Sequence, residues 1–322
     1  MKSLKHALVA LAGVAALVLA GCGSGEPITG GSDSGSDGDH DSKEITIGFA
    51  ISTLQNPFFV SMKEGVDEAA KKLGINLKFA DASDDANTQS NDVLNFITEG
   101  VDVAVLNATD GEAIASSVEA LNKAGIPVIT VDRTSEGGEI VAHIGTDNVT
   151  AGEVTAKAFF EALGGKGKVA ILEGVPGASS AIDRGTGFDN VLADFPDISI
   201  VAKQTANYQR SEGLTVAQNI LQANPDLVGF LSMNDEMALG AVEAINAAGK
   251  AGKVKTIGID GGADAVKAVC DGSLVATVAQ QSKVMGSQSI EQAVKVAKGE
   301  KIEKLQPVDV VVIDSSNCKD YL

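Results

Sequence analysis

Short apolar runs with strand character alternate with amphipathic helical patterns along most of this chain. The strand-like runs lie at 45–51, 77–80, 103–106, 127–131, 168–172, 198–204, 228–232, 256–259 and 276–279. Helical patterns lie between most of them, for example at 60–73, 87–98, 113–124, 148–163, 211–221 and 236–248. Parallel strands need long crossovers, which helices usually supply, so this alternation predicts parallel sheets covered by helices. We therefore expect an α/β fold.

The N-terminus has the features of an export signal. Lys2 and Lys5 precede an unbroken stretch of apolar residues and glycine at 7–20. That length is normal for a signal-peptide core and too short to cross a bilayer comfortably. Small residues then precede Cys22, as in a bacterial lipobox, whose cysteine receives the lipid. We predict a lipoprotein signal peptide at 1–22 with lipidation at Cys22; an ordinary signal peptide with a chance cysteine is the alternative.

A polar segment separates this signal from the first strand-like run. Residues 23–43 are rich in Gly, Ser and Asp and have too few apolar residues to form a core, which predicts a flexible acidic linker. The formal net charge is −18, and no basic stripe exists to neutralise phosphates, which argues against nucleic-acid binding. The acidity is instead expected to keep an exported protein soluble.

Polar or charged residues follow several of the predicted strands. They are Ser52, Asn107, Asp110, Asp132, Arg133, Asn234, Asp235, Asp260 (followed by Gly261) and Gln280. Carboxyl ends of parallel strands share one edge of a sheet, so these residues are expected to meet in one or two crevices. Residues 44–146 and 147–280 have a similar strand–helix rhythm, which predicts two Rossmann-like lobes with a cleft that closes by hinge motion.

The turn after the first strand indicates what such a cleft could bind. Asn56 is a good N-cap and Pro57 suits the first helical position, so a helix is expected to begin there. Beside them stand the hydroxyl of Ser52 and the rings of Phe58 and Phe59. A hydroxyl, an amide and two rings suit a small polar molecule with an apolar face, and a sugar is the obvious candidate.

Several motifs also occur in a characteristic order. They are Asn56-Pro57-Phe58-Phe59, Asp132-Arg133, Asp183-Arg184-Gly185, Asn234-Asp235-Glu236-Met237-Ala238-Leu239-Gly240, Asp260-Gly261 and Ala279-Gln280. In this order they resemble the periplasmic ribose-binding proteins, type I sugar-binding components of ABC transporters, from about residue 45 to residue 314. The resemblance implies two lobes joined by a three-segment hinge with the ligand cleft between them. The implied N-terminal lobe is 44–146 plus 281–309, and the implied C-terminal lobe is 147–280 plus 310–322.

The same resemblance implies a set of ligand-binding residues. In that family a pyranose lies between aromatic rings while polar side chains bind its hydroxyls. Carried over by position, the set is Ser52, Asn56, Phe58, Phe59, Asp132 and Arg133 from the first lobe, Arg184, Tyr208, Asn234 and Asp260 from the second, and Gln280 at the hinge. The family typically has phenylalanine where Tyr208 stands. Its added hydroxyl needs a partner if buried, which leaves the identity of the sugar open.

Each of these candidates also has a purely structural alternative. The alternatives are core packing for Phe58 and Phe59, a solvated ion pair or turn for Asp132 and Arg133, a surface pair with Asp183 for Arg184, helix capping for Asn234, an Asp-Gly turn for Asp260 and replacement of Gln280 by Gln281.

Beyond Cys22 the chain has two cysteines, Cys270 and Cys318. An exported location permits a disulfide between them, and two free thiols are the alternative. The resemblance returns the last residues to the second lobe, towards Cys270, which favours the bridge. Two isolated cysteines and the scattered residues His6, His40 and His143 indicate no metal site, and we expect no cofactor.

The combined expectation is a monomeric lipoprotein, exported and facing the periplasm or cell surface, that captures a monosaccharide, D-ribose first, for an ABC transporter permease. Other sugars (allose, galactose, xylose or a furanose signalling molecule) are alternatives, and contact with a chemoreceptor is left open. No HExxH, GxSxG or P-loop motif is present, so an enzyme is not expected. A sugar-responsive transcription regulator would need a helix-turn-helix where the lipobox and acidic linker lie.

Overall fold

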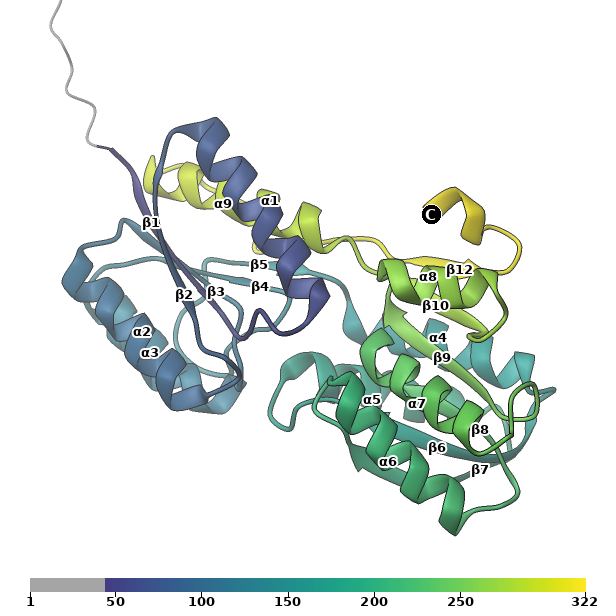
Figure 1. The fold of residues 1–322 in the computed structure, drawn as a ribbon. Helices are drawn as coiled ribbons and strands as arrows, with labels where there is room; N and C mark the ends of the chain where they lie inside the picture. Colours follow the sequence, from purple (N-terminus) through teal and green to yellow (C-terminus); the bar gives the residue numbers. More distant parts are fainter. Residues whose placement is uncertain (1–43) are drawn as a thin grey trace, which may run out of the picture. The chain divides into compact units, whose positions relative to one another are not determined.

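The computed structural model describes residues 44–322 (Figure 1). The predicted signal peptide, including Cys22, and the predicted linker at 23–43 lie outside the described residues. Among the helices of residues 44–322, none combines the length and the apolar character that a membrane crossing requires.

The first of two six-stranded sheets is parallel throughout, in the order β11-β5-β4-β3-β1-β2. Its strands are β1 (Thr46–Ile51), β2 (Asn76–Asp81), β3 (Val103–Leu106), β4 (Val128–Val131), β5 (Ala142–Gly145) and β11 (Leu305–Pro307). Its helices are α1 (Pro57–Leu73), α2 (Ala86–Glu99), α3 (Gly111–Lys123) and α9 (Ser282–Ala297). We call this part the first lobe.

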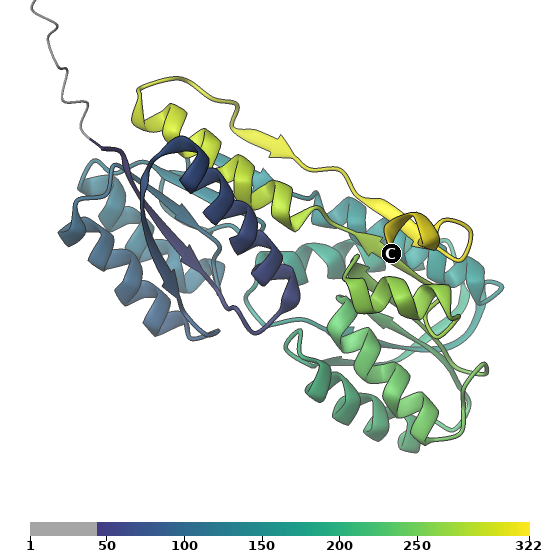
Figure 2. The same ribbon diagram turned by 45° about the horizontal axis from the view of Figure 1, so that its top comes forward.

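Alternation along the strands of the first lobe separates two apolar layers. Phe49 packs in the core that contains α1 and α9, whereas its neighbour Ala50 packs in the core that contains α2 and α3, because successive side chains point to opposite faces. The helices α1 and α9, far apart in the sequence, lie side by side in both views (Figure 1 and Figure 2). The sheet is therefore covered on both faces.

The second sheet has the order β12-β10-β9-β8-β6-β7 and is parallel except for β12, which runs antiparallel to β10. Its strands are β6 (Lys166–Glu173), β7 (Asp197–Thr205), β8 (Leu227–Ser232), β9 (Lys255–Asp260), β10 (Ala276–Ala279) and β12 (Val311–Asp314). Its helices are α4 (Asn148–Ala162), α5 (Ser179–Leu192), α6 (Arg210–Ala223), α7 (Asp235–Ala247), α8 (Ala263–Cys270) and the 3-10 helix η1 (Cys318–Tyr321). We call this part the second lobe.

The chain passes between the two lobes three times, after β5, after β10 and after β11. The predicted α/β fold class is therefore confirmed, with two sheets that are mostly parallel and carry helices. The residues at which each lobe begins and ends, 146/147, 280/281 and 309/310, stay a prediction. The periodic patterns described above do not include the strands β5, β11 and β12 or the helices α5, α8 and α9.

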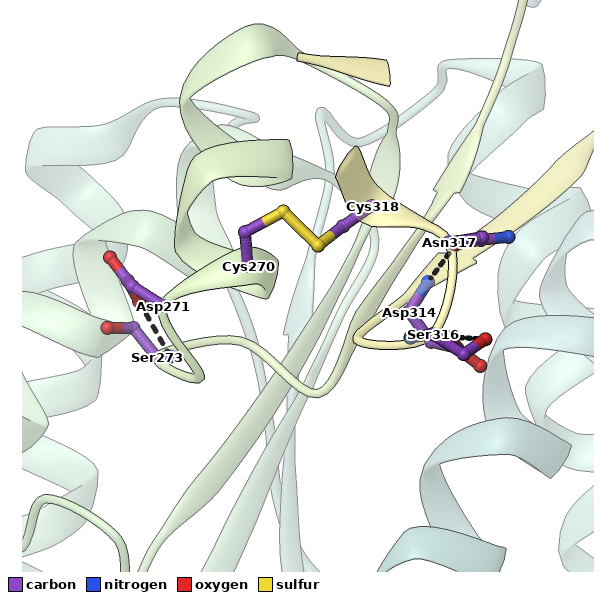
Figure 3. Close-up of a disulfide and its surroundings, with 7 residues drawn as sticks. All are labelled: Cys270, Asp271, Ser273, Asp314, Ser316, Asn317 and Cys318. Carbon is purple, nitrogen blue, oxygen red and sulfur yellow. Dashed lines mark hydrogen bonds between the residues drawn. A yellow bond between two sulfur atoms is a disulfide. The ribbon is translucent and has the colours of Figure 1, made fainter. Parts of the chain in front are cut away.

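A disulfide joins the end of α8 to the start of η1 (Figure 3). It links Cys270 to Cys318, whose Cα atoms lie 5.6 Å apart. Cys318 is buried and packs with residues of α8 in a small apolar cluster. The C-terminal segment is thereby fixed to the second lobe, as the resemblance implied.

Candidate functional site

A cavity lies where strands of both sheets end, the place where open α/β sheets bind ligands. It is lined by Asn56, Phe58, Phe59, Asp132, Arg133, Ser180, Arg184, Tyr208, Asn234 and Asp260. The first five come from the segments after β1 and β4, and the others come from α5, the segments after β7 and β8, and the end of β9. All predicted site residues except Ser52 and Gln280 line this cavity, and Ser180 is the lining residue that was not predicted.

Two adjacent phenylalanines supply apolar surface from the start of α1. The rings of Phe58 and Phe59 meet edge to face, with centroids 5.2 Å apart. Asn56 begins the helix as predicted: its Oδ1 accepts a hydrogen bond from Phe58 N at 2.9 Å, with Pro57 at the first helical position. Both rings also belong to the core of the first lobe. The core alternative and the cavity assignment are therefore both compatible with their position.

The Arg133 guanidinium lies between aromatic rings of the two lobes. Its central carbon is 4.9 Å from the ring centre of Phe59 and 5.2 Å from that of Tyr208, within the range of cation–π attraction. Its Nε and Nη1 are buried without a hydrogen-bond partner. Asp132 Oδ2 lies 3.8 Å from Nε, and both side chains are buried. A solvated ion pair is thus not what the structure shows.

Asp132 is held on one side and unpaired on the other. Its Oδ2 accepts a hydrogen bond from Asn107 Nδ2 at 3.1 Å, whereas Oδ1 is buried without a partner. Asn107 also accepts a hydrogen bond from the Ser52 hydroxyl at 2.7 Å. Ser52 therefore lies behind the site, acting on Asp132 through Asn107. The signal for Asn107 was its place after the third predicted strand.

Arg184, in contrast, has all three of its nitrogens paired within the protein. Nε donates to Asn148 Oδ1 at 2.9 Å, Nη1 to the Met233 carbonyl at 2.6 Å and Nη2 to Gln280 Oε1 at 2.7 Å. Nη1 also lies 4.0 Å from Asp260 Oδ1. Arg184 is buried in the middle of α5, so the alternative of a surface pair near a helix start is wrong.

Gln280 stands at the second passage between the lobes, just after β10. Its Oε1 is engaged by Arg184, but its Nε2 is buried without a partner. The side chain borders a neighbouring opening, which also receives Asn56, Phe58 and Asp260. Gln280 thus has a free amide group at the margin of the candidate site.

Two residues of the second lobe combine structural bonds with a place on the cavity wall. The Tyr208 hydroxyl lies 3.2 Å from Ser180 Oγ, which is the partner that a buried tyrosine hydroxyl needs. Asn234 caps α7 by accepting from Met237 N at 3.0 Å, and it donates to the Tyr208 carbonyl at 3.2 Å. The capping alternative for Asn234 is therefore correct, although the same side chain lines the cavity.

The Asp260 carboxyl is the most electrostatically perturbed group of the site. Burial raises its pKa well above the ordinary value; the Arg184 cation opposes this, and the nearby charges of Asp235 and Asp132 add to it. The backbone of Asp260 has a φ of 139°, and that of the next residue, Gly261, has a φ of 76°. Asp260 therefore does form the Asp-Gly turn, and it presents its side chain to the cavity from that turn.

Four of the seven buried side-chain atoms without a hydrogen-bond partner in residues 44–322 lie at this site. The four are Asp132 Oδ1, Arg133 Nε and Nη1, and Gln280 Nε2; Asp84 Oδ1, Thr109 Oγ1 and Thr256 Oγ1 lie outside the cavity and the adjoining opening. A buried group left unpaired costs about 1–3 kcal/mol, so such groups are rare without a ligand or water. Groups of His, Cys, Asp or Glu arranged for a metal ion are absent from the described part of the chain. The arrangement suits a ligand that offers both donors and acceptors.

Comparison with known proteins agrees with this geometry. Residues 47–301 match a family model described as a periplasmic binding protein domain. The chain belongs to the periplasmic binding proteins. This assignment confirms the resemblance inferred from the ordered motifs. It places the chain in a family of exported solute-binding proteins.

Individual relatives of this periplasmic binding protein cover most of its length. It is 45% identical over 262 residues to the ribose import binding protein RbsB of Bacillus subtilis (strain 168), spanning 81% of this chain and 85% of that protein. A solute-binding protein of Actinobacillus succinogenes 130z with bound D-allose is 36% identical, with a TM-score of 0.81, covering 86% of this chain and all of the other. A solute-binding protein of Bacillus halodurans C-125 with bound myo-inositol is 31% identical, with a TM-score of 0.84, covering 88% and 98%.

Proposed function

We propose that this chain is an extracytoplasmic solute-binding lipoprotein that captures a monosaccharide, with D-ribose as the first candidate, and delivers it to an ABC transporter permease. The observation that carries the proposal is the group of unpaired buried atoms on Asp132, Arg133 and Gln280 beside the rings of Phe58 and Phe59. A sugar ring offers hydroxyls that both donate and accept, together with weakly apolar C–H faces. It matches both kinds of surface at once.

The proposed contacts follow from the charges of the side chains. Asp132 and Asp260 accept hydrogen bonds from sugar hydroxyls, while Arg133 donates through its unpaired Nε and Nη1. Arg184 has its nitrogens engaged already, so it acts in part by fixing Gln280. Phe58, Phe59 and Tyr208 cover the faces of the ring. Ser52 acts indirectly, through Asn107. A sugar lacking one hydroxyl leaves a buried polar group unpaired, which is how such a site discriminates between epimers.

Ribose is the first candidate because the relative with 45% identity over most of the chain is a ribose import binding protein. The structural relatives bound to D-allose and myo-inositol keep other small polyols in view as alternatives, including galactose, xylose and furanoses. Tyr208 and Ser180 bring two hydroxyls to the cavity wall. Which sugar binds depends in part on whether a hydroxyl of the sugar ring can bond to them.

Hinge closure is the proposed means of capture. The lobes already touch beside the cavity: Gly111 N donates to the Gly177 carbonyl at 3.1 Å, and Thr134 N donates to Ser179 Oγ at 3.1 Å. The three chain passages between the lobes are the segments that would bend. A ligand that bonds to Asp132 in one lobe and Asp260 in the other stabilises the closed form relative to the open one.

Anchoring through a lipid on Cys22 belongs to the same proposal and has a simple test. Replacing Cys22 with Ser removes the thiol that the lipid needs, so the variant should lose its membrane fraction and partition into detergent-free buffer. An unchanged membrane fraction would remove the anchor from the proposal without affecting sugar binding.

Calorimetric titration tests the ligand directly. D-ribose, D-allose, D-galactose and D-xylose are titrated separately into the protein from residue 44 onward. We expect saturable binding of a single molecule, with D-ribose the tightest, and a rise in melting temperature by mass action. Absence of heat and of any melting shift with all of these sugars at millimolar concentration would overturn the sugar assignment.

A further inference from the structure

Asp235, the first residue of α7, is a buried carboxylate that the proposed sugar contacts do not use. Only 3% of its surface is exposed; it does not line the sugar cavity, although it borders the neighbouring opening that Gln280 also borders. Its Oδ1 accepts a hydrogen bond from the Thr277 hydroxyl at 2.7 Å, and its Oδ2 accepts one from Gly262 N at 2.8 Å. Both oxygens are therefore engaged inside the protein.

These bonds surround the turn that carries Asp260. Thr277 Oγ1 also accepts a hydrogen bond from Gly261 N at 3.1 Å. The two backbone N–H groups that follow Asp260 are thus both fixed by the pair of Asp235 and Thr277. The neighbouring strand leaves room for this carboxylate at Gly258, where an added Cβ would overlap Asp235 Oδ1. Thr277 lies beside Gly258 in the strand register.

The turn needs such support because its backbone is strained. Asp260 has φ of 139°, a region that residues with a side chain rarely adopt. Such a conformation costs on the order of 1–3 kcal/mol and persists only where the surroundings hold it. The bonds of Asp235 and Thr277 to residues 261 and 262 hold the turn from one side, and Gln280 N holds the Asp260 carbonyl at 3.0 Å.

We propose that Asp235, together with Thr277, is a positioning residue that holds the Asp260 carboxylate towards the ligand and sets the lower pH limit of sugar binding. The inference rests on the proposed function, because Asp260 is taken as a sugar ligand. Asp235 itself makes no contact with the sugar.

The carboxylates of Asp235 and Asp260 are coupled by their charges as well as by the hydrogen bonds around the turn. Burial raises the pKa of Asp235 to about 6. The charged groups around the pair are Glu236 on α7, Asp260 on β9, Arg184 on α5, Asp132 after β4, and Arg210 of α6, which pairs with Glu236 and with Asp264 of α8. The elements on the remaining sides supply the uncharged Thr277 of β10 and the Gly262 backbone.

The direction of the pH effect follows from these charges. Burial and the negative charge of Asp235 both raise the pKa of Asp260, so Asp260 takes up a proton as the pH falls and then accepts more weakly from a sugar hydroxyl. Removing the charge at Asp235 lowers the pKa of Asp260. The acid limb of the affinity profile should then move to lower pH.

Two variants separate position from charge. Thr277→Val has nearly the same shape but lacks the hydroxyl, so the turn loosens while the charge at Asp235 remains. Asp235→Asn removes the charge, yet its amide oxygen can still accept from Gly262 N and its NH₂ can donate to Thr277. Asp264→Asn, which removes an exposed carboxylate on the neighbouring helix, is the control for a general charge effect.

D-ribose is titrated into the wild type and the three variants between about pH 5 and pH 8, a window chosen to span a raised carboxyl pKa. We expect Thr277→Val to weaken binding about tenfold at neutral pH, the effect of losing one buried hydrogen bond. Asp235→Asn should keep most of the neutral-pH affinity and move the acid limb to lower pH. Asp264→Asn should change neither quantity.

The outcomes distinguish this inference from the proposed function. If the wild type binds neither D-ribose nor the other three sugars, the proposed function fails and the inference fails with it. If the wild type binds D-ribose and both variants retain its affinity and pH profile, the inference alone is overturned. Should Asp235→Asn not fold, the affinity of Thr277→Val decides, since a wild-type value there removes the positioning role.

Discussion

Two arginines of the candidate site share charge and burial but differ in their bonding. Arg133 and Arg184 are each 3% exposed. Arg184 donates to three acceptors of the protein, whereas Arg133 has two nitrogens without a hydrogen-bond partner. Buried N–H groups without hydrogen-bond partners destabilise the unliganded protein, even where the cation lies near a carboxylate, as Arg133 lies near Asp132. Arg133 therefore lowers the stability of the unliganded protein, whereas Arg184 helps to stabilise it.

This contrast predicts that the same substitution affects stability differently at the two positions. Arg133→Met should weaken sugar binding at least about 100-fold, because it removes charge-assisted donors, and it should lower the melting temperature of the unliganded protein less than Arg184→Met does, because two of its nitrogens make no hydrogen bond there. Arg184→Met should lower the sugar affinity and also the melting temperature, because it leaves Asn148 Oδ1 and Gln280 Oε1 without their donor. Calorimetry and thermal denaturation measure the two quantities. An equal fall in melting temperature for both variants would contradict this account.

At the scale of elements, local signals were predictable and long-range pairings were not. The start of α1 followed from Asn56 and Pro57, whose capping chemistry lies within one turn. The periodic pattern did not indicate α5, whose sequence includes Gly185 and Gly187 in its interior and offers a weak apolar stripe. Because α5 was not predicted, its Ser180 could not be named as the partner of the Tyr208 hydroxyl.

The polar network behind the site shows the same limit. Asp132, Asp260 and Arg184 could be named from the sequence, because the resemblance depends on short motifs in a fixed order and each of these residues lies in one. The bonds of Asn107 to Asp132 and of Arg184 to Gln280 join residues separated by 25 and 96 positions. Such pairs depend on how the sheets and helices pack, which periodicity and capping do not determine.

The contact between α3 and the loop before α5 predicts a selective effect on closure. Gly177 has φ of 83°, and an added Cβ would overlap the Asp110 carboxylate of the first lobe, whereas Gly164 has φ of 70° and open space around it. Both Gly177→Ala and Gly164→Ala should lose about 1 kcal/mol of stability from backbone strain. Only Gly177→Ala should also weaken sugar binding in calorimetry, and equal affinities for the two variants would exclude the contact from closure.

The disulfide predicts a loss of stability without a loss of binding. Replacing both Cys270 and Cys318 with Ser frees the C-terminal segment, and closing a loop of this length is worth about 2–4 kcal/mol. Denaturant unfolding should show that decrease. The sugar affinity should not change, because neither cysteine lines the cavity or the adjoining opening. A weaker affinity in the double variant would mean that the C-terminal segment supports the site.

For the molecule as a whole, the two sheets bring together groups that neither lobe could combine alone. The first lobe contributes Asp132, Arg133 and the phenylalanine pair, and the second contributes Tyr208 and Asp260. Three chain passages connect the lobes, so the distance between these groups can change by bending at few residues. We therefore expect a ligand that bonds to both lobes at once to reduce the distance between them.

A crystal structure with D-ribose bound tests the central claim most directly. The account predicts the sugar between the lobes, with its hydroxyls hydrogen-bonded to Asp132 Oδ1, to Arg133 Nε and Nη1 and to Gln280 Nε2, the atoms that lack partners without it, and with Phe58 or Phe59 against a face of the ring. A ribose molecule bound elsewhere, or bound in the cavity while these atoms stay unpaired, would contradict it.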